Sequence, residues 1–381
     1  MAKRTIGKPR FYADLGQYLK AKGYYSGVSS GGISSGTGKE DLFTMNPYQQ
    51  REFDITSTAS QINFEFKIHP ELDSPDNRQL AALLLEMNYV GVLGHNLKSL
   101  TDEDDDNIKN IFFRFRGEDG GSSVYANQVD PTEIVNYVPG GNEGVPEYNG
   151  YSLWGIAGVS NYGSFDMFSR ARFEIKTQTD ESGVSVDFGE DKKIKIGALT
   201  FGRYFEPSHS FDLKAKIKTS YSGIKVSTTP GGSTLTQTNY LKKNWGDLPA
   251  WTLEKQSGHD YNIGAERSTR EWDVSLTYLS DEDVFSKAGN ENKFFTWTDQ
   301  EVSEDGTPEY VFDESMASFF KLTLNGGLPF IFCPNSSGSD PDNVDGEIDL
   351  EFAICRITKT PVFKQVANGV FSTSLTITEV M

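Results

Sequence analysis

Cysteine and histidine are scarce in this chain: two cysteines and four histidines occur among 381 residues. Two cysteines cannot form the disulfide framework that stabilises small secreted domains. The sequence contains no C-x-x-C pair, and no two histidines stand at the spacing of an H-E-x-x-H zinc site. The sequence therefore gives no support for a zinc ion.

Long hydrophobic runs are also missing. The longest apolar stretch, Leu80 to Leu85, falls far short of the ~18 residues that a membrane-spanning helix needs. The N-terminus is basic, with Lys3, Arg4, Lys8 and Arg10, but no hydrophobic segment follows it as in a secretory signal. We therefore expect a protein that is made in a cytoplasm, has reduced thiols and has no membrane span.

Catalytic signatures are absent as well. No G-x-S-x-G, G-x-x-x-x-G-K-[ST] or G-x-G-x-x-G motif stands between a predicted strand and a predicted helix. We predict that the chain is not an enzyme and that it has no catalytic residues and no cofactor. A glycosidase with two carboxyl groups remains an alternative, because the sequence offers 54 acidic residues and does not indicate a pair among them.

The net charge of the chain is −18 and its pI is about 4.7. Binding to phosphate groups needs a basic face, so we expect no nucleic-acid partner. Aromatic residues make up 13% of the chain and glycine contributes 37 residues, which favours strands and tight turns over helical bundles.

Alternating apolar and polar residues predict many strands, each with one buried face. Such patterns cover QINFEFKI, IFFRFRG, REWDVSLTYLSD and VFSTSLTITEV, and in them we expect buried side chains at Phe64, Phe66, Trp272, Leu276, Leu375 and Ile377. Tyr278 continues the alternation of REWDVSLTYLSD. LKAKIKTSYSGIKVST predicts two further strands around a turn at Ser222-Gly223.

Helices are few and short, at 78–86 and at 314–324, the second with Asp313 as its N-cap.

These patterns predict an all-β chain of antiparallel β-sandwich or barrel domains, with long loops and a few short helices. We expect an N-terminal arm and Gly/Ser-rich linker over 1–45, a β-sandwich domain over 46–180 and a second β-rich domain over 181–381. The arm, with a short amphipathic helix over 11–22, is predicted to serve assembly and to lie outside the core.

One loop is a candidate calcium site. Asp340, Asp342 and Asp345 precede Gly346, and hard oxygen ligands in a glycine-containing loop suit calcium. Val344 occupies the third ligand position of an EF-hand, so the spacing departs from that motif. The alternating Asp102, Asp104 and Asp106 lack the glycine. For both segments the alternative is a solvated loop.

The two cysteines lie in LPFIFCP and LEFAICRI, which flank the polar loop around Val344. If these segments pair about Val344, Cys333 and Cys355 stand directly opposite each other as a buried, reduced pair. A register shift of one residue would place them on opposite faces of the sheet.

His95, in Gly94-His95-Asn96, allows two interpretations. It is a candidate functional residue, or it is a buried corner that forms hydrogen bonds with neighbouring backbone groups. His209 lies in a predicted turn between strands.

The motif NYVGVLGHNL followed by FFRFRG resembles the GHN-containing β-sandwich modules in structural proteins of tailed bacteriophages. The segments IGALTFGRYFEPSHSFDLKAKIKTSYSGIKVSTTPGGSTL and REWDVSLTYLSDEDVF are similar to virion proteins of marine phages, as are LPFIFCPN, FAICRI and FKQVANGVFSTSLTITEV. The segments 23–40 and 117–150 have no counterpart in the resemblance.

The resemblance implies a structural subunit of a phage particle, most simply a ring-forming tail-tip or baseplate adaptor. Its expected partners are copies of itself in a ring or shell and other virion proteins, and its expected location is the virion. The alternatives are a receptor- or glycan-binding virion module, a head decoration protein and a glycan-degrading enzyme.

Overall fold

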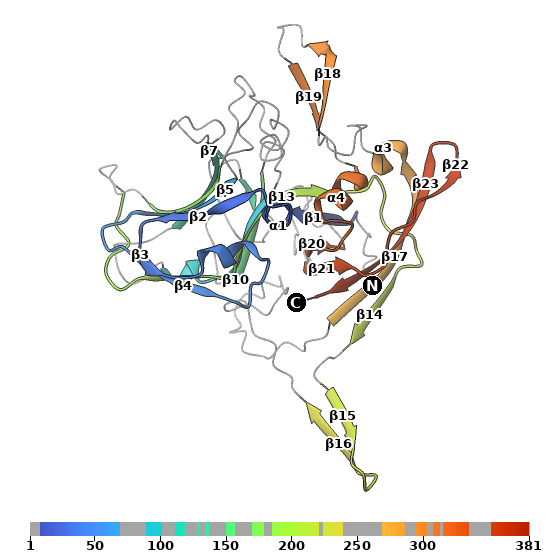
Figure 1. The fold of residues 1–381 in the computed structure, drawn as a ribbon, viewed down its shortest axis with the longest axis horizontal. Coiled ribbons are helices and arrows are strands. Elements are labelled where there is room, and N and C mark those ends of the chain that lie inside the picture. The colour runs from blue at the N-terminus through green and yellow to red at the C-terminus, as the bar shows by residue number, and fades with distance from the viewer. Residues whose placement is uncertain are drawn as a thin grey trace, which may run out of the picture.

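The computed structural model shows an all-β chain with antiparallel sheets and a few short helices (Figure 1). It describes residues 8–68, 89–100, 111–118, 128–129, 134–136, 150–156, 170–178, 185–220, 224–238, 269–285, 295–302, 308–312, 315–334 and 352–380. The predicted helix 78–86 lies outside these residues.

The largest sheet has 11 strands and dominates the body of the protein. Its strand order is β14 (Lys216–Ser220), β17 (Thr269–Ser280), β23 (Val370–Glu379), β21 (Ala353–Ile357), β20 (Phe330–Cys333), β1 (Arg10–Asp14), β13 (Ala198–Phe205), β6 (Tyr89–His95), β10 (Gly150–Ile156) and β9 (Ile134–Asn136), with β22 (Lys364–Ala367) paired to β23.

Two smaller sheets and two separate hairpins complete the strands. The second sheet has the order β2 (Tyr25–Gly31), β5 (Gln61–Ile68), β11 (Arg170–Thr177), β7 (Ile111–Glu118) and β8 (Gln128–Val129), and the third has the order β12 (Lys193–Ile196), β4 (Arg51–Ile55) and β3 (Ile33–Gly36). The hairpins are β15 (Ile224–Thr228) with β16 (Thr234–Thr238), and β18 (Phe295–Val302) with β19 (Pro308–Phe312). Short helical segments are α1 (Leu15–Ala21), η1 (Lys39–Phe43), η4 (Leu97–Leu100), α3 (Asp281–Val284) and α4 (Met316–Leu322).

The main core lies between the second sheet and the large sheet. Phe201 of β13 has Phe43, Phe66, Phe115 and Phe173 around it, with ring centroids 5.5 to 6.2 Å away. Such aromatic clusters bury large apolar areas and account for most of the packing energy of a sandwich. The six side chains predicted to be buried from strand alternation are all in the core, so that prediction is confirmed.

The described part of the N-terminal segment belongs to the core, so the prediction that this segment lies outside the core is wrong. β1 occupies an interior position of the large sheet, where it pairs with β13 on one side and with β20 on the other. Phe11 and Tyr12 are buried, and Leu15 and Leu19 of α1 are buried beside them. The basic charge and the glycine-rich sequence around this segment gave no sign of a strand, because the strands that pair with β1 lie far away in the sequence.

The large sheet also crosses the expected boundary between residues 180 and 181. β6 comes from the first predicted domain and β13 from the second, yet they pair over Ala198 to Gly202. Antiparallel partners need no proximity in sequence, so composition alone does not show such a connection.

A bulge in β17 overturns one buried position suggested by alternation. Tyr278 has a φ of 65° and the register shifts between Leu276 and Leu279. Because a bulge inserts one extra residue, it moves the next side chain to the other face. Tyr278 is 71% exposed, and Leu279 takes its place in the core.

The two cysteines do not face each other. β20 and β21 pair antiparallel as predicted, but Phe330 stands opposite Cys355. The register is shifted from the one expected, so the thiols lie in different core clusters on opposite faces of the sheet. Both cysteines are buried and no disulfide joins them, as expected for structural thiols.

Helix α4 lies within the predicted range 314–324, but Ser315 is its N-cap. The Ser315 hydroxyl accepts a hydrogen bond from the Ser318 backbone N–H at 3.2 Å. The predicted cap, Asp313, lies outside the described residues. The helix ends before Leu324, Asn325 and Gly326, all of which have positive φ.

Candidate functional site

The GHN motif is the first candidate, and its histidine is fully buried at the end of β6. His95 Nδ1 accepts a hydrogen bond from the Leu97 backbone N–H at 3.3 Å, and Nε2 lies 3.0 Å from Ser152 Oγ. Since Nδ1 is an acceptor, the proton lies on Nε2, which donates to Ser152. Burial lowers the pKa of His95 to about 3, so the ring is neutral near pH 7. The buried-corner interpretation of His95 is confirmed.

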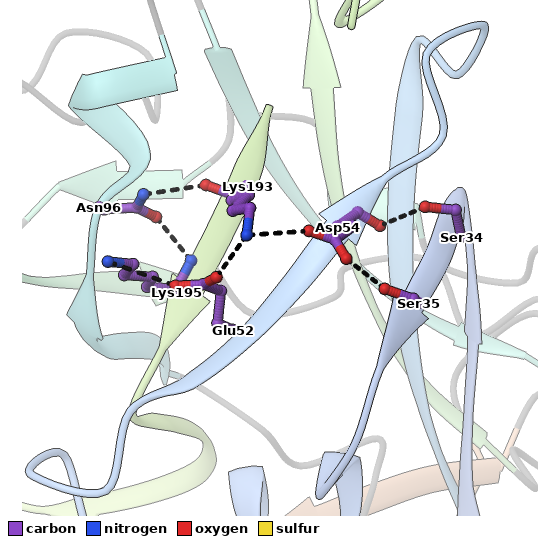
Figure 2. Close-up of polar contacts among 7 residues, drawn as sticks. All are labelled: Ser34, Ser35, Glu52, Asp54, Asn96, Lys193 and Lys195. Carbon is purple, nitrogen blue, oxygen red and sulfur yellow. Dashed lines mark hydrogen bonds and ion pairs between the residues drawn. The ribbon is translucent and has the colours of Figure 1, made fainter. Parts of the chain in front are cut away.

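The side chain of Asn96 forms hydrogen bonds with the edge strand β12 of the third sheet (Figure 2). Its Nδ2 donates to the Lys193 carbonyl at 3.0 Å, and its Oδ1 accepts from the Lys195 backbone N–H at 2.7 Å. The side-chain amide thus forms hydrogen bonds with the backbone of β12 that a neighbouring strand would otherwise form. Gly94 makes the preceding turn at a φ of 65°, where a Cβ would lie 2.5 Å from the Pro47 carbonyl oxygen. The three motif residues therefore have structural roles.

We expect Asn96→Ala to destabilise the protein by about 1–2 kcal/mol, because two hydrogen bonds to the β12 backbone are lost. Asn96→Asp keeps the bond from the Lys195 N–H, loses the donor to the Lys193 carbonyl and should give an intermediate value. Urea unfolding midpoints measure both. Equal midpoints for the wild type and Asn96→Ala would contradict this role.

The exposed face of the third sheet carries alternating charges (Figure 2). Lys193 Nζ lies 2.9 Å from Glu52 Oε1 and 3.4 Å from Asp54 Oδ1, and Lys195 Nζ lies 3.4 Å from Glu52 Oε2. The hydrogen bond from Lys193 lowers the pKa of Glu52, and the hydrogen bond from the Ser35 hydroxyl lowers the pKa of Asp54. A glycosidase acid needs a raised pKa. This carboxylate pair therefore lacks the property of a general acid.

The calcium candidates Asp340, Asp342 and Asp345 lie outside the described residues, and so do Asp102, Asp104 and Asp106. Among the residues that the structure does describe, no group of three or more His, Cys, Asp or Glu side chains could hold a metal ion. His209 is exposed in a loop after β13.

A projecting hairpin is the second candidate. β15 and β16 pair with each other as a separate two-stranded sheet, and they extend away from the body on the side opposite β18 and β19 (Figure 1). The two strands predicted around Ser222-Gly223 exist, but they do not pair together: β14 joins β17, and β15 joins β16. Residues 221–223 lie outside the description.

The hairpin and the adjacent strand expose apolar side chains. Val226 and Leu235 are 60% and 57% exposed. Val226 pairs with Thr236 and Leu235 pairs with Ser227, so the two apolar side chains lie on opposite faces of the hairpin. Leu213 and Ile217, just before the hairpin, are 96% and 63% exposed. An isolated two-stranded hairpin is only marginally stable in water. This combination is typical of a segment that packs on a partner.

The alternating pattern of Leu213, Ala215 and Ile217 indicated a strand with one apolar face, but it did not indicate that Leu213 and Ile217 are exposed. Strand alternation looks the same whether the apolar face is buried in the core of the chain or binds another protein.

No family model, no curated protein and no solved structure matches this chain. In the described part of the structure, no helix is long and apolar enough to cross a membrane.

Proposed function

We propose that this protein is a structural subunit of a bacteriophage particle, a ring-forming tail-tip or baseplate adaptor that assembles with copies of itself and with other virion proteins. The observation that carries the proposal is the projecting β15–β16 hairpin with its exposed Val226 and Leu235. The resemblance of the GHN and C-terminal segments to virion proteins supports the same function.

The arrangement suits an assembly subunit because a rigid body carries an extended segment. The large sheet is buried on both faces around β1, where one core cluster contains Phe11 and the other contains Tyr12. β14, which precedes the hairpin, is held in the large sheet by its pairing with β17, so this part of the segment has a fixed place on the body. Such preorganisation lowers the entropic cost of association.

The purified full chain is expected to self-associate, and replacement of 224–238 by a short Gly-Ser linker is expected to yield a monomer. The free energy of unfolding of the monomer should stay unchanged, because β15 and β16 pair only with each other among the described strands. Sedimentation velocity measures the first property and urea unfolding the second. Negative-stain images of the wild type should show closed rings.

The matched variant Val226→Thr/Leu235→Thr places threonine, a β-branched residue that favours strands, at both positions and so replaces the two exposed apolar side chains with polar ones. It should weaken self-association while leaving the unfolding midpoint in place. A wild-type chain that stays monomeric over the whole accessible concentration range would contradict the proposed function.

A further inference from the structure

The projecting hairpin β15–β16 has two open edges as well as two exposed faces. Among the described strands, β15 and β16 pair only with each other, in five consecutive register pairs without a shift. Every side chain that the structure describes in these two strands is exposed. A two-stranded hairpin is marginally stable in water, and three or more strands are needed for independent stability. The hairpin therefore lacks at least one strand of a stable sheet.

The loop of the hairpin shows which backbone groups point outward. The Thr229 N–H donates to the Ser233 carbonyl at 2.8 Å, and the N–H of Gly232, which has a φ of 83°, donates to the Thr229 carbonyl at 2.9 Å. Thr229 and Ser233 are therefore a hydrogen-bonded pair around a three-residue loop. In an antiparallel ladder such pairs alternate with pairs whose N–H and C=O groups point away from the partner strand. Val226 and Thr236 form a pair of this second kind, so their backbone groups lie on the outer edges of β15 and β16.

Every other sheet edge in the described part of the chain has a feature that hinders pairing with a further strand. β8 and β9 are very short, with two and three residues. The register shifts in the pairings of β2, β3 and β22 and in the β18–β19 hairpin. β14 carries Lys216 and Lys218, and the Asn96 side chain occupies the backbone groups at the open edge of β12. Short strands, bulges, lysines and covered edges are the means by which proteins prevent edge-to-edge association.

The β15–β16 hairpin lacks this protection. Its strands have five residues each and a regular register. Lys225 is the single charged residue of 224–238, in a chain of which 24% of the residues are charged. Pro230 lies in the loop, where it removes no N–H from the ladder. The chain thus protects its other described edges and leaves these two open, which indicates that the hairpin pairs with further strands.

We infer that the outer edge of β16 in one copy pairs with the outer edge of β15 in the next copy, so that the hairpins of neighbouring copies form one continuous antiparallel sheet. This inference rests on the proposed assembly function and specifies its contact. β15 and β16 are antiparallel within each hairpin. Hairpins that lie side by side in the same orientation therefore also place β16 of one copy antiparallel to β15 of the next. The contact consists of backbone hydrogen bonds, as in other cases of strand addition.

A second copy is the occupant because the hairpin itself supplies the only unprotected edges among the described strands. Pairing through two identical edges would leave the other edge of each hairpin open, whereas pairing of β16 with β15 uses both. Since these two edges differ, the contact is heterologous, and a closed ring of such contacts leaves no edge open. The hairpin extends away from the body (Figure 1), so a neighbouring copy can reach both edges.

Proline substitution tests the pairing one edge at a time. Proline has no backbone N–H and is tolerated in a strand where that N–H takes no part in the ladder. Val226→Pro therefore blocks the outer edge of β15, and Thr236→Pro blocks the outer edge of β16. The hydrogen-bonded pair Ser227 and Leu235 inside the hairpin is kept in both variants. Val226→Ile and Thr236→Val are the matched controls, because they keep the N–H and the preference for strands.

Each proline variant alone is expected to self-associate more weakly than the wild type by roughly ten-fold or more, because edge hydrogen bonds are lost. The two controls should associate like the wild type. An equimolar mixture of the two proline variants should form a dimer and nothing larger, because one open β16 edge and one open β15 edge remain. Sedimentation velocity measures these sizes, and urea midpoints check that the body is folded in every variant. Amide exchange within 224–238 should slow when the wild type associates.

Three outcomes would overturn the inference. Both proline variants may associate like the wild type, one of them alone may still form dimers through two identical edges, or their mixture may stay monomeric. In each of these cases the wild type still self-associates, so the proposed function stands and only the contact is wrong. A wild-type chain that is itself monomeric contradicts the proposed function, and the two failures are thereby distinguished.

Discussion

A chain that lacks residues 1–14 is expected to be unable to fold. The deletion removes β1, whose backbone forms hydrogen bonds with both β13 and β20, and so separates the large sheet into two parts. Phe11 alone packs against the rings of Phe205, Phe211, Phe319, Phe330 and Phe332. Truncating one such phenylalanine costs about 3–5 kcal/mol, and a whole domain has only about 5–15 kcal/mol of stability.

Thermal unfolding followed by circular dichroism tests this expectation, and the truncated chain should show no cooperative transition. Excision of 224–238 is the control, because it removes a segment of similar length that pairs only with itself among the described strands. A truncated chain with a native-like cooperative transition would show that β1 is dispensable.

Asp14 is expected to make stability depend on pH in the direction opposite to most carboxylates. Its side chain is buried at the N-terminus of α1, where Oδ1 accepts a hydrogen bond from the Gln17 backbone N–H at 2.6 Å. Oδ2 has no hydrogen-bond partner of normal geometry among the described residues. Burial raises the pKa of Asp14 to about 6, although the nearby Thr200 hydroxyl and the Gln17 and Phe201 amides act to lower it.

The raised pKa means that the folded state binds the proton more tightly than the unfolded state does. The stabilising contribution of protonated Asp14 is therefore complete below the unfolded value of 3.8 and is lost as the pH rises through about 6. A change from 3.8 to about 6 corresponds to about 3 kcal/mol.

Asp14→Asn isolates this effect because asparagine is an equally good N-cap and does not titrate. Urea unfolding of both proteins between pH 4 and pH 7 gives a difference in which the other carboxylates cancel. The variant should gain about 3 kcal/mol relative to the wild type over this range. A difference that stays constant with pH would rule out a buried, titrating Asp14.

Strand alternation predicted much of the core, because it depends only on neighbouring residues. β5, β17 and β23 show their apolar faces directly in the sequence, and their buried residues followed from period two. The all-β class followed in the same way. The bulge at Tyr278 escaped prediction, since a local backbone choice with φ of 65° leaves no pattern in the side chains.

Pairing between distant segments could not be predicted in this way. The place of β1 depends on partners in β13 and β20, and the register of Cys355 opposite Phe330 depends on the whole neighbouring sheet. For the candidate site, the buried role of His95 was an available interpretation, whereas the projection of β15 and β16 was not. Exposure of Val226 depends on what the rest of the chain leaves uncovered.

The interior position of β1 has a consequence for biosynthesis. β1 leaves the ribosome well before β20, because about 300 residues separate the two strands along the chain. At synthesis rates of about 5–20 residues per second, the nascent chain waits roughly 15–60 s before that neighbour exists. During this interval Phe11 and Tyr12 lack their neighbours in β20, and the large sheet cannot close until β20 has been synthesised. We therefore expect chaperones to bind the emerging chain at these apolar side chains.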